Sequence, residues 1–202
     1  KYASSNWSAP AGGSFAGATY TTGNNFTSFG DFIVAETMAA PTVTAVGLYQ
    51  ADRTTAVTAM TPQVEYAVKV SVTDIYNLSN LTTVYATLYY DASGTYNPLN
   101  VPSSGNNQTA AIMTDTVGGS PSWSFDPGIS TTWSLVTGNS SQPSLAGTSG
   151  DFWFHFKPGK IATAGSGKWF IFARATSPYG SGDNHQDNRT MNWYGEISVN
   201  TA

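Results

Sequence analysis

Two stretches decide the fold of this chain: residues 64–74, which read VEYAVKVSVTD, and residues 81–91, which read LTTVYATLYYD. Apolar and polar residues alternate in both. Because successive side chains of a strand point to opposite faces of a sheet, each stretch predicts a strand with one buried face. The buried face of the first stretch is expected to carry Val64, Tyr66, Val68, Val70 and Val72. The sequence NLSNLT at residues 77–82 supplies turn residues, so we predict that the two strands pair as a β-hairpin.

Strand signals continue toward both ends of the chain. Residues 152–156 read FWFHF and residues 169–175 read WFIFARA, and both are apolar on two faces, which is typical of strands between packed layers or beneath an added segment. Shorter strands are expected at residues 31–36, 43–50, 109–114, 121–125, 132–136 and 190–199. Because about nine short strands are separated by Gly, Pro, Asn and Ser, and helical periodicity is almost absent, the sequence predicts an all-β sandwich.

The first residues differ in composition from the rest. Residues 1 to about 28 are rich in Gly, Ala, Ser and Thr, so we expect an N-terminal arm over 1–28 and a sandwich domain over 29–202. An extended segment of this kind can place small side chains in a groove of another subunit. The residues expected to make that contact are Phe15, Ala16, Ala18 and Tyr20. A flexible tail, or a first edge strand of the chain's own domain, are the alternatives.

Composition narrows the class of protein. The 202 residues include twelve acidic and eight basic residues, no Cys, and a charged fraction of 10%. Without a basic cluster we expect no nucleic-acid partner, and no apolar run approaches the ~20 residues of a membrane span. Because the chain begins with Lys1, we expect that a signal segment has been removed and that the protein is extracellular. Because so few ion pairs can form, protonation of the carboxylates in an acidic exterior would remove little stability.

The strongest motif signal is for modification. Seven of the fourteen Asn residues fit the Asn-x-Ser/Thr acceptor pattern for N-glycosylation, whereas chance would give about three or four. These seven are Asn6, Asn25, Asn77, Asn80, Asn107, Asn139 and Asn188. Each falls in the arm, in an expected turn or at a strand boundary, where a glycan can point to solvent. We therefore expect covalent N-glycans and no other cofactor.

Catalytic patterns are weak, so we predict that the protein is not an enzyme and name no catalytic residue. There is no Cys and no Gly-x-Ser-x-Gly motif for nucleophilic catalysis, and His155 lies in an aromatic strand where a packed histidine is the commoner role. An acid-active hydrolase that uses Glu196 is the third functional hypothesis. The loop expected at 183–188 makes Asp183 and Asp187 weak metal candidates, and a hydrated loop is favoured over a calcium site.

Tryptophan supports a second hypothesis, a secreted carbohydrate-binding or adhesin module. Aromatic faces stack on sugar rings as they do on other apolar surfaces. The tryptophans expected to be exposed are Trp7, Trp123, Trp133 and Trp193, whereas Trp153 and Trp169 are expected in the core.

The strand sequences at 66–74, 77–91, 152–158 and 168–176 together resemble the Ig-like sandwich domains of archaeal cell-surface proteins, over roughly half of the chain. With the sequons, the absence of Cys and the low charge, the chain resembles the thread-type extracellular filament subunits of thermoacidophilic archaea. That resemblance implies an Ig-like β-sandwich with an N-terminal arm. It also implies glycosylated subunits, identical to one another, that join head to tail on the cell surface by donor-strand exchange. Adhesion, biofilm formation and surface coating are the alternatives for the use of such a filament.

Overall fold

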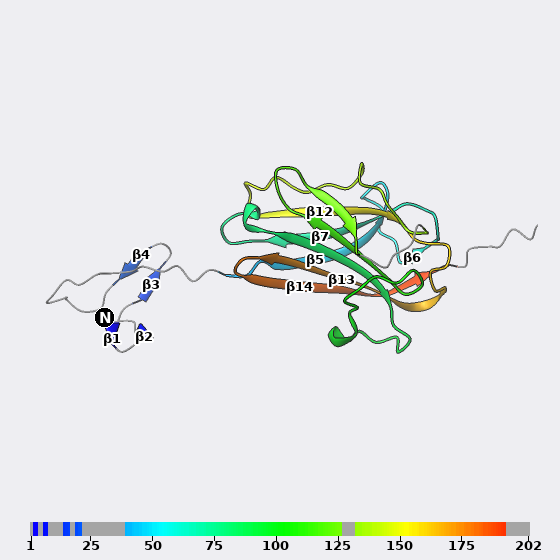
Figure 1. Cartoon of the computed structure of the whole chain (residues 1–202), viewed down its shortest axis with the longest axis horizontal. Helices are drawn as coiled ribbons and strands as arrows, with labels where there is room; N and C mark the ends of the chain where they lie inside the picture. The colour runs from blue at the N-terminus through cyan, green and yellow to red at the C-terminus, as the bar shows by residue number, and fades with distance from the viewer. Residues whose placement is uncertain are drawn as a thin grey trace, which may run out of the picture. The chain divides into compact units, whose positions relative to one another are not determined.

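A computed structural model of the chain (Figure 1) describes residues 2–3, 6–7, 14–16, 19–21, 39–126 and 132–192, without the side chains of the N-terminal strands and of residues 166, 167 and 188. The chain divides into two compact units, Lys1–Met38 and Ala39–Ala202. The first contains two short antiparallel pairs, β1 (Tyr2–Ala3) with β2 (Asn6–Trp7), and β3 (Ser14–Ala16) with β4 (Thr19–Thr21). The expected boundary at residues 28/29 lies outside the described residues.

The second unit is an all-β sandwich, as the sequence predicts. Its larger sheet has six strands, in the spatial order β10 (Ser122–Phe125), β9 (Ala110–Thr116), β8 (Thr83–Tyr90), β13 (Gly165–Ser177), β14 (Gly180–Met191) and β6 (Ala59–Met60). The smaller sheet has the order β11 (Ser134–Leu135), β12 (Ser149–Lys157), β7 (Tyr66–Thr73) and β5 (Thr42–Gln50). Neighbouring strands are antiparallel except β14 and β6, which are parallel. Two single-turn 3₁₀ helices, η1 (Leu78–Asn80) and η2 (Pro98–Asn100), lie in loops.

The predicted hairpin between the strands at residues 64–74 and 81–91 is wrong. β7 and β8 belong to different sheets, and the segment between them crosses from one layer to the other. Its apolar residues Leu78 and Leu81 are buried in the core, and the Leu78 N–H donates to the backbone oxygen of Gly147, 2.8 Å away. The buried leucines stabilise the crossing because they cover the end of the core, which a solvent-exposed hairpin turn would not do.

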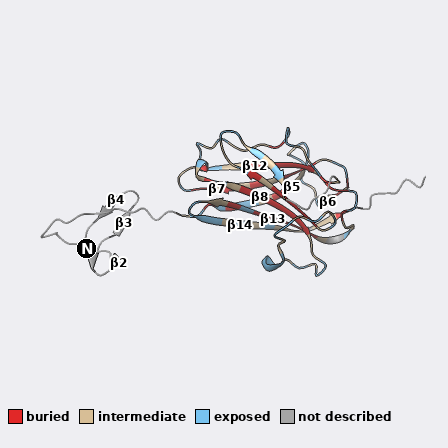
Figure 2. Cartoon of the chain, in the orientation of Figure 1, coloured by how far each residue is buried: buried red, intermediate tan, exposed pale blue. Residues whose placement is uncertain are grey.

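The core lies between the two sheets (Figure 2) and takes one face of each central strand. β7 alternates as predicted from Tyr66 to Val72, whereas Val64 precedes the strand and is exposed. From the smaller sheet the core receives Val68, Val70, Val72, Phe152, Phe154 and Phe156, and from the larger sheet Val84, Ala86, Leu88, Trp169, Ile171 and Ala173.

The second apolar face of β13 is also buried, as its sequence indicates. Phe170 and Phe172 point away from the main core and pack with Tyr89 on the outer face of the larger sheet. Tyr96 and Val101, from the long connection between β8 and β9, cover them. This is the added segment that two-sided apolar strands require.

The loop expected at residues 183–188 is instead part of a strand, β14, Gly180–Met191. Of the strand expected at 190–199, residues 190 and 191 belong to β14 and the residues from 193 onward lie outside the described ones. β14 has no apolar alternation because its pairing with β13 depends on backbone hydrogen bonds, and a polar sequence suits a strand near a sheet edge. The strands expected at 43–50, 109–114, 121–125 and 132–136 are present as β5, β9, β10 and β11. The one expected at 31–36 lies outside the described residues.

Over the described ranges, the chain contains no helix with the length and apolar character needed to cross a membrane.

Candidate functional site

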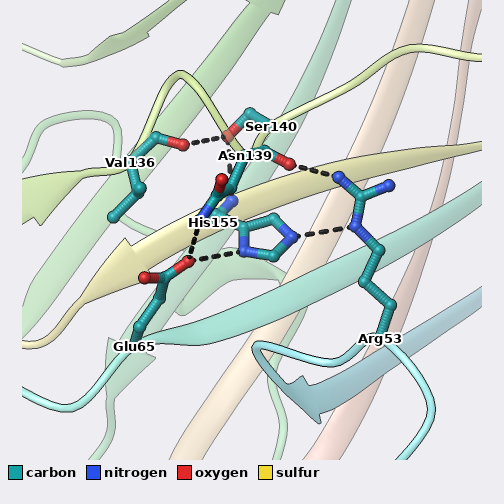
Figure 3. A network of polar contacts seen from close by, with 6 residues as sticks. All are labelled: Arg53, Glu65, Val136, Asn139, Ser140 and His155. Carbon is teal, nitrogen blue, oxygen red and sulfur yellow. Dashed lines mark hydrogen bonds and ion pairs between the residues drawn. The ribbon is translucent and has the colours of Figure 1, made fainter.

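The most connected polar cluster of the sandwich surrounds His155, on the outer face of the smaller sheet (Figure 3). Because Phe154 and Phe156 point into the core, His155 of β12 points outward. The side chain is nevertheless only 2% exposed, since Arg53 and the turn at residues 137–140 cover it.

Hydrogen bonds fix the tautomer of His155. The Arg53 Nε–H donates to Nε2 at 3.0 Å, so Nε2 is the acceptor. The proton therefore lies on Nδ1, which is 2.9 Å from Glu65 Oε1. The same oxygen accepts a hydrogen bond of 2.7 Å from Asn139 Nδ2, and the Asn139 backbone oxygen accepts from Arg53. Both ring nitrogens are thus engaged.

Burial and hydrogen bonding oppose each other in this cluster. Burial lowers the pKa of His155 more than the contact with Glu65 raises it, so the neutral ring is favoured. Burial alone would raise the pKa of Glu65, but the hydrogen bonds from Asn139 and His155 outweigh it and the pKa falls below its usual value. The pair is therefore a neutral imidazole donating to a carboxylate.

The cluster connects loops; it lacks the geometry of a catalytic dyad. Ser140 Oγ donates to the Val136 backbone oxygen at 3.2 Å and accepts from the His155 N–H at 3.0 Å, so its hydroxyl is not aimed at the ring. Arg53 has φ +61°, an uncommon backbone conformation for a residue other than Gly. The side-chain contacts of Arg53 hold this loop conformation against β12.

An aromatic and cationic row continues from Arg53 across the outer face of the sheet. The Arg53 guanidinium lies 5.3 Å from the Trp153 ring centroid, and Tyr49 packs edge-on to Trp153 at 5.5 Å. The expectation of a core position for Trp153 is wrong, because the residue is only half-buried and alternates outward with His155. Trp169 is confirmed in the core.

The tryptophans expected at the surface do not form a binding platform in the described residues. Trp133 is 3% exposed and packs against Phe156 and Trp169, so the expectation of exposure is wrong. Trp123 is partly buried against the core. Trp193 and the side chain of Trp7 lie outside the described residues.

Four of the seven sequons lie in turns of the described sandwich. Asn77 caps η1, Asn80 ends it, and Asn107 and Asn139 lie in the turns at 107–109 and 137–139. Asn188 lies inside β14, where a register shift opposite Trp169 and Ile171 marks a bulge, so its expected place in a loop is wrong. Asn6 is in β2 and Asn25 lies outside the described residues.

At two of these asparagines, hydrogen bonds of the side-chain amide are compatible with a glycan on its nitrogen. The Asn77 side-chain oxygen accepts from the Ser79 N–H at 3.1 Å and from the Ser79 hydroxyl, so the oxygen, not the nitrogen that carries a glycan, makes these contacts. At Asn139 the amide nitrogen itself donates to Glu65. A glycan there replaces one of the two N–H groups and leaves the other for Glu65.

The remaining candidates are scattered. Asp183 and Asp187 lie in β14 and face Arg174 at 3.4 Å and His185 at 3.5 Å, respectively. In the part of the chain that the structure describes, no three His, Cys, Asp or Glu side chains gather as a metal site.

The arm residues are only partly described. Phe15 of β3 pairs with Tyr20 of β4, and Ala16 pairs with Thr19, so this stretch doubles back as a short hairpin. Ala18 lies outside the described residues, as does Glu196 near the C-terminus.

Sequence reasoning missed one buried carboxyl group. Asp115 follows Ala111 and Met113 on the inner face of β9 and is completely buried. Neither carboxylate oxygen has a hydrogen-bond partner among the described residues, and the same is true of the indole nitrogen of Trp123, its cross-strand neighbour. Burial raises the pKa of Asp115 to about 7. The alternation Ala111, Met113, Asp115 was the available signal, because it places position 115 on the core face.

The fold defines the class of the chain as an all-β sandwich protein. Compared with known proteins, the chain matches no family model, no curated protein and no solved structure.

Proposed function

We propose that this protein is a structural subunit of an extracellular, N-glycosylated surface filament whose identical subunits join head to tail by donor-strand complementation. In this proposal the arm, residues 1 to about 28, completes the sandwich of the next subunit. Phe15, Ala16, Ala18 and Tyr20 make the inserted contacts.

The observation that carries the proposal is the position of the two ends of the sandwich chain. Ala40, at the start of the unit, lies against Gly180, where β14 begins: a Cβ built on Gly180 would be 3.0 Å from that of Ala40. At the other end of β14 the Asn192 N–H donates to the Met60 oxygen at 2.8 Å. β14 has 12 residues and therefore spans about 36 Å between these points (Figure 1).

A chain that enters a sandwich at one end and leaves it at the other is suited to linear assembly. In the proposal, the unit Lys1–Met38 joins one neighbour and the sandwich Ala39–Ala202 receives the corresponding unit of another copy. Such a contact joins two different surfaces. It does not close on itself, so it propagates into a fibre.

We place the acceptor for the arm at the seam between β10 and β11. These are edge strands of the two sheets, and they lie close to each other. Three apolar side chains of these strands are only partly buried, Trp123 and Phe125 of β10 and Leu135 of β11. At the opposite side the sheets are joined, since Asn184 Nδ2 donates to the Val43 oxygen at 3.2 Å. An added strand would pair with the outer backbone edge of β10 and cover these side chains.

Glycans at the turns fit the same role. Asn77, Asn80, Asn107 and Asn139 lie outside the strands, so their glycans leave the strand edges free for pairing. Peptide mass spectrometry on the native protein should find glycan mass on the peptides that contain Asn77, Asn80 and Asn139. Unmodified peptides at all three would remove the glycoprotein part of the proposal.

Deletion of residues 1–22 tests the assembly. Electron microscopy of the native protein should show thin fibres, and the deleted subunit should stay monomeric with an unchanged unfolding transition. Because it keeps the acceptor, it should also shorten fibres when mixed with full-length subunits. Fibres formed by the deleted subunit alone would contradict the proposal.

A second candidate function is carbohydrate binding, favoured by a groove on the outer face of the larger sheet. The groove has a volume of about 510 Å³, and its lining includes Tyr85 and Phe172 together with Arg174 and Asp126. This combines the half-buried Tyr85 ring, for stacking, with hydrogen-bonding groups, as sugar recognition requires. The test is glycan-array binding by the monomer. It should be lost in Tyr85→Ala and retained in Tyr179→Ala, an exposed tyrosine elsewhere.

A further inference from the structure

Three buried polar atoms meet where β9 pairs with β10. They are the two carboxyl oxygens of Asp115 and the indole nitrogen of Trp123, and none of them has a hydrogen-bond partner among the described residues. Asp115 and Trp123 lie directly opposite each other on the two strands. Because nearly all buried polar groups in proteins are hydrogen-bonded, three unpaired atoms at one place require a physical explanation.

The register of the two strands brings these side chains close together. Directly after β10, the Asp126 N–H donates to the Ile112 oxygen at 2.9 Å. Backbone hydrogen bonds join every second pair of an antiparallel ladder, so the pair of Trp123 and Asp115, three positions away, is one that they skip. Side chains approach each other most closely in such pairs. Water that entered between the strands there would reach all three atoms.

β10 is the element that can move away from Asp115 most easily. It has four residues and lies at the edge of the larger sheet, where β9 is its neighbour. Its residues Ser122 and Ser124 are exposed, and the other two are only partly buried. β8, on the other side of Asp115, has eight residues and is paired along both edges. Local opening that admits water to Asp115 therefore breaks the fewest contacts at β10.

The turn between β9 and β10 provides a hinge for this movement. A Cβ built on Gly118 or Gly119 would meet no atom within 4 Å, so there is open space around both residues. Gln142 Nε2 donates to the Gly118 oxygen at 2.5 Å and ties the turn to the segment that precedes β12. β10 can therefore separate from β9 while the turn stays in place.

The surroundings of Asp115 are uncharged. Beside it lie Val84 on β8 and Trp123 on β10, whereas Asp126 lies on the outer face and accepts from the Gly105 N–H at 3.2 Å. The core faces of β7 and β12 carry uncharged side chains, namely Val68, Val70, Val72, Phe152, Phe154 and Phe156. Among the described residues, burial alone raises the pKa of Asp115. Its own proton is therefore the charge that changes at this place.

We propose that β10 is a pH-gated edge strand, which stays paired with β9 in acid and separates from it as Asp115 loses its proton and takes up water. A neutral carboxyl group can remain in the buried position, whereas a carboxylate there has lost its hydration and has no donor to replace it. Separation of β10 hydrates the carboxylate and the Trp123 indole together. The gate belongs to the single sandwich, so it does not depend on the assembly of subunits.

Amide hydrogen exchange of the full chain, followed by NMR from about pH 4 to about pH 7, tests the gate. The rate of each amide is divided by its rate in an unstructured peptide, which gives the opening constant. For the Ser124 and Asp126 amides, which face β9, this constant should rise by up to tenfold per pH unit and about a thousandfold in all, because opening releases the proton that the closed strand retains. At each pH these amides should exchange faster than the amides of the central strand β8.

One variant assigns the effect to the carboxyl group. In Asp115→Asn the opening constants of the Ser124 and Asp126 amides should not change with pH. Asp183→Asn, the same change at an exposed position, should keep the full rise. A rise in Asp115→Asn that equals the rise in the wild type would overturn the proposal, because another group would then control the strand.

Two further outcomes can be read from the wild-type protein alone. Opening constants of β10 that do not change with pH would show that the strand opens without exposing Asp115. Equal protection of β10 and β8 at every pH would show that β10 opens only when the whole sandwich unfolds. Either result would overturn the proposal, and neither depends on the folding of a variant.

Discussion

Asp115 should make the sandwich more stable in acid than at neutral pH. Its carboxyl is completely buried, and burial raises the pKa from 3.8 to about 7. In the unfolded chain the group ionises near its ordinary pKa, whereas in the folded chain it keeps its proton up to about pH 7. The unfolded state therefore binds fewer protons between these values, and stability falls as the pH rises from about 4 to about 7. Each pKa unit corresponds to about 1.4 kcal/mol, so the fall is about 4 kcal/mol.

The variant Asp115→Asn isolates this contribution because it keeps the shape and removes the charge. The free energy of unfolding should be measured in urea at about pH 3 and about pH 7. Between these values it should fall by about 4 kcal/mol less in the variant than in the wild type. At about pH 7 the variant should be the more stable protein. Asp183→Asn, the same change at an exposed position, serves as the control and should change stability by no more than about 0.5 kcal/mol at either pH.

Two results would refute the reasoning. Parallel curves for wild type and Asp115→Asn against pH would mean that Asp115 ionises alike in the folded and unfolded chains. A variant that is less stable than the wild type at about pH 7 would mean that the ionised carboxylate makes a hydrogen bond which the amide cannot replace.

Two further predictions concern the Arg53–His155 contact and the backbone of β14. Arg53→Gln should raise the pKa of His155, measured by NMR titration of the ring, because the Arg53 charge lowers that pKa; an unchanged value would contradict the assigned contact. Gly182→Ala should destabilise the fold by about 1–3 kcal/mol, since a Cβ would collide with the Pro41 backbone oxygen, whereas Gly118→Ala, with open space around it, should be nearly neutral in the same thermal unfolding assay.

The strands that the sequence predicts well are those whose side chains alternate against a core. β7 is an example, because burial of one face imposes a period of two on its residues. The same signal does not say which strand is the neighbour. Alternation describes the faces of a strand, whereas pairing is decided at its edges. The segment around Leu78 reads as a turn in either arrangement, and only its burial shows that it crosses between sheets.

β14 is a strand that the sequence does not predict. Its residues from Asp183 to Asn188 carry no apolar period, and the sequence suggests a hydrated loop. The strand forms because β13 offers a long edge of backbone groups, a non-local cause that leaves no mark on the sequence of β14 itself. The cluster around His155 could not be predicted from the sequence for a similar reason. Arg53, Glu65 and Asn139 come from three separate loops, and only the folded sheet brings them to one histidine.

The ionisable groups of the sandwich act in opposite directions in acid. The pKa of His155 is lowered, so the folded state loses stability as the pH falls through about 6.5, where the unfolded ring gains its proton. The raised pKa of Asp115 stabilises the folded state by about 4 kcal/mol as the pH falls from about 7 to about 4, and this opposes the loss at His155. The ion pairs of Lys69 and Arg174 both include exposed carboxylates and contribute little to stability. Protonation of Glu65, whose pKa lies below its usual value, weakens its hydrogen bonds with Asn139 and His155 in acid as well. The buried carboxyl of Asp115 therefore offsets losses in the cluster around His155 as the pH falls.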